Sequence, residues 1–529
     1  MNAWSRHRWY AKPVTSALLG ISCLGLSAFA GGGGPVAALG APLAVPRAVC
    51  GPGDHPESAL QGQVPAYLRA AGFHGFNCNL QLIGQSKGDG ANWQTTEFKD
   101  RVGHTCGYHG TAFTTANRTH VGVPVVDLTD PTNPTPTGYL TTTSMLDPWE
   151  SLKVNERRQL LAADNGHNGG GGPEVDIYDV SADCRFPQLL ASVAVGTAGG
   201  GGIVSPVIGH EGAWAPDGLT YYGGDLRTNG GQYYAVDTTN PRAPQLITTW
   251  HPGIASVHGM SISDNGNRGY FVSLGGLSGT PLADLTDPTK PATNGLLVYD
   301  LSQIQARVPN PQVPLVSKLL WKDGSVAQHT IPVKIGGKPY IIFIDEAGSG
   351  GLSSLAQATG ACAAGFTPFP MARIIDISDE TNPAIVSRLM LEIHAVKSCP
   401  MVLPDIVGLS TFTYGSHYCS VDNKQNATTL VCGYFNAGIR VFDIRDPLQP
   451  KEIAYYNPAG VTTASSGSNH VRAGGWVAGG PDWCSAQVHL DAAKGTLWTT
   501  CQDNGLLMLK FTNNVWPFPE SSTPPGEQN

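Results

Sequence analysis

The stretch "VVDLTDPTNP", residues 125–134, ends an apolar run in Asp127 and then stops at two prolines. The phrase returns five times in altered form, as "IYDVSADCRFP", "AVDTTNPRAP", "VYDLSQIQARVPNP", "IIDISDETNP" and "VFDIRDPLQP". Successive aspartates of the phrase are 52 to 76 residues apart in the chain. Recurrence at this spacing indicates a repeat architecture.

Each copy lies in a unit that has the same order of short apolar runs and turns. An apolar stretch, a β-rich run and the run that ends in Asp are separated by turns, and a Pro-closed turn leads to a last run such as "PQLITTW". Four antiparallel strands in about 50 to 70 residues describe a propeller blade. The Asp can accept hydrogen bonds from the following turn, where Pro fixes φ. The phrase therefore predicts the corner between the third and fourth strands.

Seven units of this kind predict an all-β fold, a seven-bladed β-propeller. The seventh unit, "CSAQVHLDAAKGTLWTTCQDNGLLMLKF", lacks a fourth strand, and "NLQLIGQSKG" at residues 79–88 has the pattern of one but precedes any first strand. We expect this N-terminal strand to complete the last blade, because ring closure removes an exposed sheet edge. The expected parts are a signal peptide at 1–30, a Gly/Ala/Pro-rich linker at 31–48, the propeller at 49–515 and a Pro-rich tail at 516–529.

The phrases "VVDLTDPTNP" and "IIDISDETNP" resemble the LVIVD repeat of exported and cell-surface bacterial proteins. The resemblance covers nearly all of the chain that follows the expected signal peptide. It implies a β-propeller and no particular activity, because most members of that family have none assigned. The looser copies at Asp237 and Asp300 predict irregular corners in blades three and four.

Composition and charge exclude some partners and locations. With 66 Gly, 40 Pro and only 14% charged residues, the chain favours turn-rich β structure over long helices. A net charge of -8 provides no basic stripe for nucleic acid. Residues 1–30 combine an Arg/Lys-containing start with a short apolar run that ends at "AFA", which predicts an export signal rather than a membrane anchor. The mature protein is expected to be secreted, extracellular or periplasmic, without a membrane span.

The cysteine count fits an oxidising compartment. Apart from Cys23 in the expected signal, ten cysteines remain, which is an even number and favours disulfides. Cys419 with Cys432 and Cys484 with Cys501 are predicted pairs across neighbouring strands. The remaining six cysteines allow fifteen connectivities, among which the sequence does not choose.

Five histidines occupy related positions in consecutive units. The first strand of each blade lines the central channel, and the first strands expected in blades three to seven each contain one histidine: His210, His258, His329, His417 and His489. Four of them stand seven or eight positions before the following turn. His489 stands six before Gly495, so we expect it one layer along the axis. Blades one and two begin with Trp93 and Trp149 instead.

Neutral imidazoles in this number suit a transition metal better than calcium or magnesium, and iron or copper is expected ahead of zinc. Channel histidines inherited by blade duplication that only bind water are the competing interpretation. Glu211, Asp345 and Glu346 are candidate partners for the second ring nitrogens. His104, His109, His120, His167, His251, His394 and His470 are expected in loops or at the surface, with His394 the most plausible exception.

Two further families share features of this pattern. "SVHGMSIS" is similar to the histidine-containing inner strand of carotenoid-cleavage oxygenases, which are seven-bladed propellers with four hub histidines on iron(II). The corners resemble "YDISDP" corners of selenium-binding proteins, related to methanethiol oxidase, whose hub histidines are associated with copper. Neither resemblance extends over the chain, and together they imply redox chemistry at a propeller-bound metal.

Three functions are compatible with the sequence. The first is a secreted metal-dependent oxidoreductase acting on a small molecule, with His210, His258, His329 and either His417 or His489 as ligands. The second is a non-enzymatic propeller that binds a cell-surface protein or a polysaccharide. The third is zinc-dependent hydrolysis with Glu211 as the base.

Overall fold

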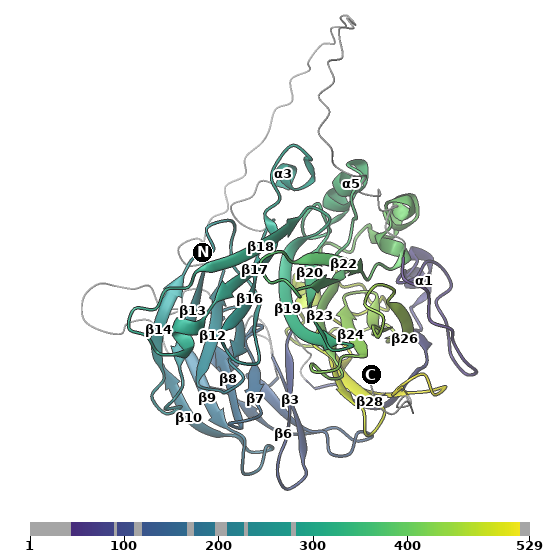
Figure 1. Cartoon of the computed structure of the whole chain (residues 1–529). Helices are drawn as coiled ribbons and strands as arrows, with labels where there is room; N and C mark the ends of the chain where they lie inside the picture. The colour runs from purple at the N-terminus through teal and green to yellow at the C-terminus, as the bar shows by residue number, and fades with distance from the viewer. Residues whose placement is uncertain are drawn as a thin grey trace, which may run out of the picture. The chain divides into compact units, whose positions relative to one another are not determined.

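The computed structural model describes residues 44–88, 93–110, 119–166, 174–195, 209–226, 231–276 and 282–518. These residues contain 29 strands in seven sheets, and the predicted seven-bladed β-propeller is confirmed. In Figure 1 the inner strands, such as β3 and β7, lie nearer the centre, and β10 and β14 lie at the outer edge. The predicted signal peptide, residues 31–43 of the linker and residues 519–529 of the tail lie outside the described residues.

Six blades contribute four consecutive strands from the inside outward. Blade one is β3 Thr95–Lys99, β4 Thr105–His109, β5 Val123–Asp127 and β6 Thr135–Leu140; blade two is β7 Lys153–Asn155, β8 Leu160–Asp164, β9 Val175–Asp179 and β10 Gln188–Val193; blade three is β11 Glu211–Trp214, β12 Thr220–Asp225, β13 Gln232–Asp237 and β14 Gln245–Trp250. Blade four is β15 Met260–Ile262, β16 Arg268–Ser273, β17 Asn294–Asp300 and β18 Leu315–Trp321; blade five is β19 Ser325–Ile335, β20 Lys338–Ala347, β21 Ala372–Asp376 and β22 Ala384–Arg388; blade six is β23 Ser416–Val421, β24 Thr429–Tyr434, β25 Gly438–Asp443 and β26 Lys451–Asn457.

The last blade is closed by the N-terminal strand, as predicted. Strand β2, Leu80–Ser86, pairs antiparallel with β29, Gly505–Phe511, which follows β27 His489–Asp491 and β28 Thr496–Cys501. The sequence did not predict β1, Phe76–Cys78, which adds a fifth strand to blade six by pairing with β26. The N-terminal part of the chain therefore covers the outer edges of two neighbouring blades.

The repeated phrase forms the corners between third and fourth strands. In all six copies the aspartate accepts a hydrogen bond from the amide two residues later, over 2.7 to 3.1 Å. A register shift follows in each of these strand pairs. The corner after Asp237 keeps this geometry, and in blade four helix α4, Ser302–Gln305, is added while the Asp300 hydrogen bond is retained.

The hydrophobic core lies between neighbouring blades. For example, Val272, Leu296 and Val298 of blade four pack against Ile341 and Phe343 of blade five. Burial on both faces requires apolar residues at successive positions of the middle strands, which is why these runs do not alternate with polar residues.

The remaining helices lie in connections. They are α1 Ala66–Ala71, α2 Thr143–Leu146, α3 Leu282–Thr286, α5 Leu355–Ala363, η2 Glu392–His394, η3 Val396–Ser398, α6 Cys399–Val402, η4 Pro404–Ile406 and α7 Asn469–Arg472. No helix in the described part of the chain has the length and apolar character needed to cross a bilayer.

Five disulfides join the ten cysteines. The two predicted pairs, Cys419–Cys432 and Cys484–Cys501, are confirmed. The other pairs are Cys50–Cys78, Cys106–Cys184 and Cys362–Cys399.

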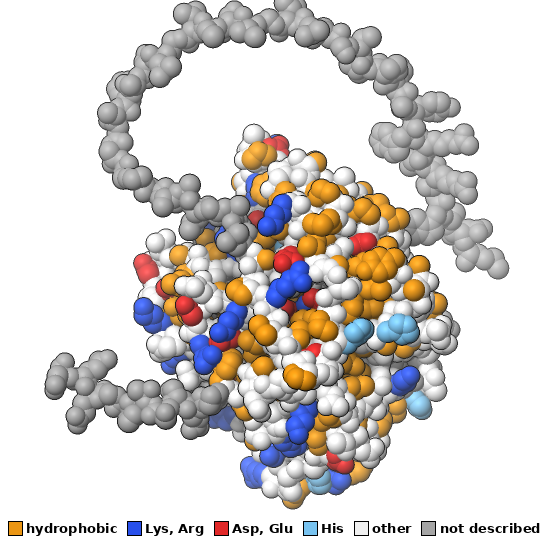
Figure 2. Space-filling model, turned by 90° about the vertical axis from the view of Figure 1, so that its right-hand side faces the viewer, with side chains coloured by type: hydrophobic (Ala, Val, Ile, Leu, Met, Phe, Trp, Pro, Cys, Tyr) orange, Lys and Arg blue, Asp and Glu red, His pale blue; other side chains and the backbone are white. Residues whose placement is uncertain are grey.

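Two short segments next to the predicted propeller boundaries pack against it. Val45 is buried and its amide bonds to the Met390 carbonyl over 2.8 Å. Trp516 is also buried and donates to Thr429 over 2.7 Å. On the face shown in Figure 2, Lys and Arg side chains are interspersed with acidic and apolar ones.

Candidate metal centre

Five buried side chains from five blades converge in the central channel. Glu150, His210, His258, Glu346 and His417, here called the hub cluster, come from blades two to six, and each is at most 7% exposed. Because the first strands of all blades approach one axis, residues that are far apart in the sequence meet there.

Local backbone structure places each member of the hub cluster. Glu150, His210 and His258 stand just before strands β7, β11 and β15, whereas Glu346 and His417 lie within β20 and β23. The Glu150 amide donates to the His210 carbonyl over 2.9 Å, which joins blades two and three. Beside His258, a Cβ on Gly259 would lie 2.2 Å from the Gln328 carbonyl oxygen, so glycine permits the close approach of blades four and five.

The carboxylate of Glu150 is the centre of the hub cluster. Its Oε2 lies 3.0 Å from Nε2 of His258 and 3.1 Å from Nε2 of His210, and its Oε1 lies 3.1 Å from Nε2 of His417. Glu346 Oε1 is 3.3 Å from the same nitrogen of His417. Three imidazole nitrogens therefore face one carboxylate, and a second carboxylate stands beside them.

Backbone carbonyls set the orientation of two of these rings. Nδ1 of His258 lies 2.9 Å from the Ala327 carbonyl, and Nδ1 of His417 lies 2.8 Å from that of Ser485. A carbonyl only accepts, so Nδ1 carries the hydrogen in both rings and Nε2 is directed to the cluster. This is the arrangement of metal-binding histidines, whose second nitrogen is held by a partner.

The charges in the hub cluster are strongly coupled. Burial alone would raise the pKa of Glu150, but the neighbouring imidazoles hold it well below its usual range. Burial alone would lower the pKa of His258 and of His417. Hydrogen bonding to Glu150 instead raises the pKa of His258 to about 9. Hydrogen bonding to Glu150 and Glu346 raises the pKa of His417 to about 10. Carboxylate oxygens thus face imidazole nitrogens, and these nitrogens can hold either protons or a metal cation.

The donor set fits a transition-metal ion. Glu150, His210 and His258 present ligand atoms that all lie within 4.8 Å of one another, as do Glu150, Glu346 and His417. Two imidazoles and a carboxylate on one face are a ligand set of non-haem iron(II), and imidazole also suits copper and zinc. The carboxylates in this set were not expected as ligands from the sequence.

A cavity of about 460 Å³ opens onto the hub cluster. Four cluster members, Glu150, His210, His258 and Glu346, contribute to its lining. The rest of the lining is mostly apolar, with Asn469 and Arg472 as polar additions, and includes Trp93, Trp149, Leu226, Leu274, Leu352, Phe412 and Trp483. The tryptophans expected where blades one and two lack a histidine therefore line the cavity. Its size and lining are those of a small-molecule site.

His329 and His489 lie elsewhere in the channel. His329 stacks on Tyr418 with ring centroids 4.6 Å apart, and its Nε2 accepts from the Cys419 amide over 3.5 Å. His489 stacks on Trp498, and its Nε2 lies 2.9 Å from the Thr95 hydroxyl. Burial lowers the pKa of both, to about 4 for His489. Neither belongs to a metal-compatible group among the described residues.

Two predicted carboxylates, Glu211 and Asp345, belong to no metal-compatible group among the described residues. Glu211 is buried, with one oxygen 3.9 Å from Nζ of Lys153, and burial raises its pKa to about 8. Asp345 pairs with Arg373 over 2.6 Å and accepts from Asn294. Of the three carboxylates proposed from the sequence, Glu346 is the one that touches a cluster histidine.

Sequence reasoning missed Glu150, although a signal was present. Glu150 stands three residues before the first strand of blade two, much as His258 stands two residues before that of blade four. The position carries a carboxylate in blade two, so the histidine pattern of blades three to seven did not include it. Glu346 lies on a second strand, so its approach to His417 depends on how blades five and six pack.

The assignment of seven other histidines to loops or the surface was wrong for three. His109 in β4, His394 in η2 and His470 in α7 are 4%, 0% and 1% exposed. His394 accepts from the Leu391 amide over 2.7 Å, inside the excursion that follows blade five. His104, His120 and His251 are partly or fully exposed, and His167 lies outside the described residues.

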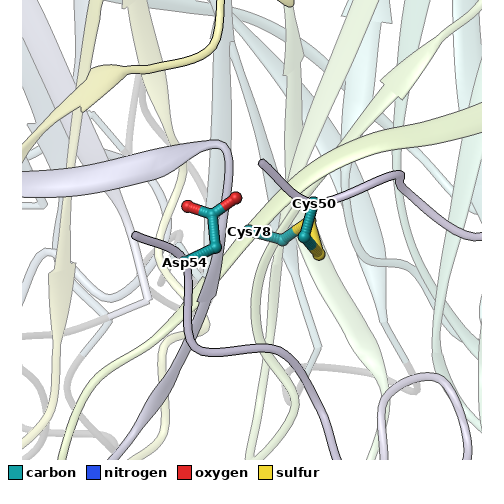
Figure 3. Close-up of side chains that lie close together, drawn as sticks. All are labelled: Cys50, Asp54 and Cys78. Carbon is teal, nitrogen blue, oxygen red and sulfur yellow. A yellow bond between two sulfur atoms is a disulfide. The ribbon is translucent and has the colours of Figure 1, made fainter. Parts of the chain in front are cut away.

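Two further groups of three potential metal ligands in the described residues have other roles. Figure 3 shows Asp54 beside Cys50 and Cys78, whose sulfurs are bonded to each other and so offer no thiolate. Asp54 accepts from the amides of Gly51 and Asn79. Near blade one, His104 bonds to Asp100 over 2.9 Å, and Asp183 is paired with Arg185.

Comparisons with known proteins add no assignment of activity. No protein-family model matches the chain, and no curated protein matches it. The solved structures that resemble it include hydrazine synthase of Kuenenia stuttgartiensis, at 12% identity and a TM-score of 0.45, covering 81% of this chain and 97% of that one. Another is a putative 6-phosphogluconolactonase of Bacteroides uniformis, at 12% identity and a TM-score of 0.46, covering 77% and 91%.

Proposed function

We propose that this protein is an exported oxidoreductase that holds one iron or copper ion in the hub cluster and oxidises a small, largely apolar molecule. The observation that carries the proposal is the contact of three imidazole Nε2 atoms with Glu150 at 3.0 to 3.1 Å beneath an aromatic cavity. The mixed imidazole and carboxylate donors favour iron over copper.

We assign the ligand positions to Glu150, His210, His258 and His417. The carbonyls of Ala327 and Ser485 hold two of these rings with Nε2 facing Glu150. When bound, the ion supplies one-electron redox chemistry with dioxygen as the oxidant.

The other side chains of the cavity would position the substrate and manage its proton. Trp93, Trp149 and Trp483 provide flat apolar walls that exclude water and hold a ring or a chain. Glu346 lines the cavity and touches His417, so its carboxylate is placed to accept a proton from the substrate. Glu211, the base expected from the sequence, faces Lys153 instead.

We also propose that the protein is secreted into an oxidising compartment. Five disulfides join all ten cysteines of the described chain, as in proteins that fold in oxidising compartments. Together with the expected signal sequence at residues 1–30, they support an extracellular or periplasmic location.

The test is elemental analysis of untagged protein from an exporting host, followed by oxygen uptake with a panel of small aromatic and aliphatic alcohols, thiols and alkenes. Wild type should contain about one iron or copper per chain. The His258→Gln/His417→Gln double variant should lose both the metal and the uptake. The His489→Gln variant, which changes a half-buried channel histidine outside the hub cluster, should retain them.

Other outcomes would replace the proposal. One zinc per chain and a reaction that continues without oxygen would indicate hydrolysis. Folded wild type that stays metal-free after reconstitution with iron or copper would leave a secreted propeller that binds a protein or polysaccharide.

A further inference from the structure

A second buried group of potential ligands lies beside the cavity wall. His470 is in α7, Asp482 lies in the long connection between blades six and seven, and Asp503 is in the turn between β28 and β29. Their exposures are 1%, 2% and 4%, and the group shares no residue with the hub cluster. One ligand atom of each lies within 4.8 Å of those of the other two.

A disulfide brings the two carboxylates together. Asp482 stands two residues before Cys484, and Asp503 stands two residues after Cys501, its disulfide partner. The Asp503 amide donates to Asp482 Oδ2 over 2.9 Å. The covalent link and this hydrogen bond therefore hold both aspartates against each other in the protein interior.

The imidazole of His470 is directed at this pair without bonding to it. Its Nδ1 is 3.6 Å from Asp503 Oδ2 and 4.0 Å from Asp482 Oδ1. Neither ring nitrogen of His470 has a hydrogen-bond partner among the described residues, and Asp503 Oδ2 has none either. Buried polar atoms left without partners are costly, so the unpartnered His470 Nδ1 and Asp503 Oδ2, which face each other over 3.6 Å, call for a ligand.

The remaining oxygens are already occupied by structural hydrogen bonds. Asp503 Oδ1 accepts from the Ser465 amide over 2.9 Å, and Asp482 accepts from the amides of Trp483 and Asn504, each over 2.7 Å. No Lys or Arg forms an ion pair with either aspartate in the described part of the chain. The group thus combines two buried carboxylates with an imidazole nitrogen and lacks a cation.

We propose that His470, Asp482 and Asp503 bind a divalent metal ion, zinc by their ligand chemistry, at a site separate from the hub cluster. One imidazole and two carboxylates match zinc, whereas calcium requires six or more oxygens. Ligands about 2.0 to 2.2 Å from one ion are roughly 3.3 to 3.6 Å apart in a tetrahedron. Separations of 3.6 and 4.0 Å need only a small inward movement.

This ion fixes part of the cavity wall. The neighbours Asn469, Arg472 and Trp483 line the hub cavity, and the His470 ring stacks on Trp483 with centroids 4.6 Å apart. A metal ion that joins His470 to Asp482 and Asp503 ties α7 to the base of blade seven. Its role is structural, and it positions the wall without touching the substrate.

Zinc titration in a background that lacks the hub ligands tests the proposal. The full mature chain carrying His258→Gln/His417→Gln is stripped with a chelator and titrated with zinc against a chromogenic competitor. We expect one equivalent to bind and to raise the melting temperature. Adding Asp503→Asn or His470→Gln should weaken binding at least tenfold, whereas adding His74→Gln, at an exposed histidine, should leave it unchanged.

The outcomes separate this site from the proposed function. Absence of zinc binding in the folded hub double variant would overturn the second site, whatever the hub ion of wild type proves to be. Equal affinity in the Asp503→Asn and His470→Gln variants would overturn it as well, because the zinc would then lie elsewhere. If Asp503→Asn fails to fold, His470→Gln alone decides, since it removes no hydrogen bond between described residues.

Discussion

Glu150 is the single residue on which the proposed centre depends most. It is the common neighbour of His210, His258 and His417, and it is buried with them. Removing its charge removes both an anionic ligand and the shared partner of three imidazole Nε2 atoms.

We predict that Glu150→Gln weakens metal binding by at least about tenfold. The amide has nearly the same size but no negative charge, and its NH₂ group would face imidazole nitrogens. Metal content after dialysis against a graded chelator series measures the effect. Glu97→Gln, a change of a channel carboxylate that bonds to Trp498, is the matched control. Full metal retention in Glu150→Gln would contradict the assigned ligand set.

His394 makes the protein sensitive to acid. Burial lowers its pKa from 6.5 to about 3, so the folded protein keeps this ring neutral while the unfolded chain binds a proton below pH 6.5. Its contribution to stability is complete above that pH and is lost as the pH falls towards 3, by on the order of 1.4 kcal/mol per pH unit.

We predict that His394→Asn has a shallower loss of stability between about pH 6 and pH 4 than wild type. The asparagine oxygen can still accept from the Leu391 amide, which His394 accepts over 2.7 Å. Urea unfolding at a series of pH values gives both slopes. Parallel slopes would show that His394 is not the responsible group, and His74→Asn should behave as wild type.

At the scale of elements, the blade corner is the unit that the sequence specifies best. Six aspartates bond to their turns in the same way because the interaction is local and needs only neighbouring residues. Helix α4 after Asp300 could be accommodated because it follows the repeated Asp–amide hydrogen bond and does not replace it.

The closing strand β2 packs tightly against the first corner. A Cβ on Gly84 would lie 2.3 Å from the Pro131 carbonyl oxygen, in the turn of the phrase at residues 125–134. Gly138 follows the same kind of register shift on β6, but a Cβ there would meet nothing within 4 Å. The two glycines therefore differ in packing and not in strand position.

We predict that Gly84→Ala destabilises the protein by about 1 to 3 kcal/mol, because backbone of blade one must move. Gly138→Ala should change stability by less than about 0.5 kcal/mol. Chemical unfolding of both variants measures the difference. Equal effects would mean that strand propensity, and not the contact with Pro131, decides.

At the scale of the whole molecule, ring closure depends on residues that come before the first blade. Strands β1 and β2 pair with β26 and β29, at the outer edges of blades six and seven. Without them those edges would present unpaired backbone groups that favour association between molecules.

We predict that a chain starting at Trp93 forms oligomers or aggregates, whereas a chain starting at Ala44 remains monomeric. The shorter chain loses β1, β2 and both cysteines of the Cys50–Cys78 disulfide, so no free thiol is created. Size-exclusion chromatography with light scattering distinguishes the two. A monomeric, cooperatively folding short chain would show that blade seven is stable with three strands.

The sequence determined the repeat, the number of blades, the corner geometry, the strand that closes the ring and two disulfides, because each rests on local patterns or on neighbouring strands. It also placed histidines on the inner strands or directly before them. Only the tertiary structure decided that His210, His258 and His417 meet at Glu150 and Glu346 while His329 and His489 do not. Strand position sets the layer of a residue, but which side chains touch depends on how neighbouring blades tilt and pack, and no local pattern records that.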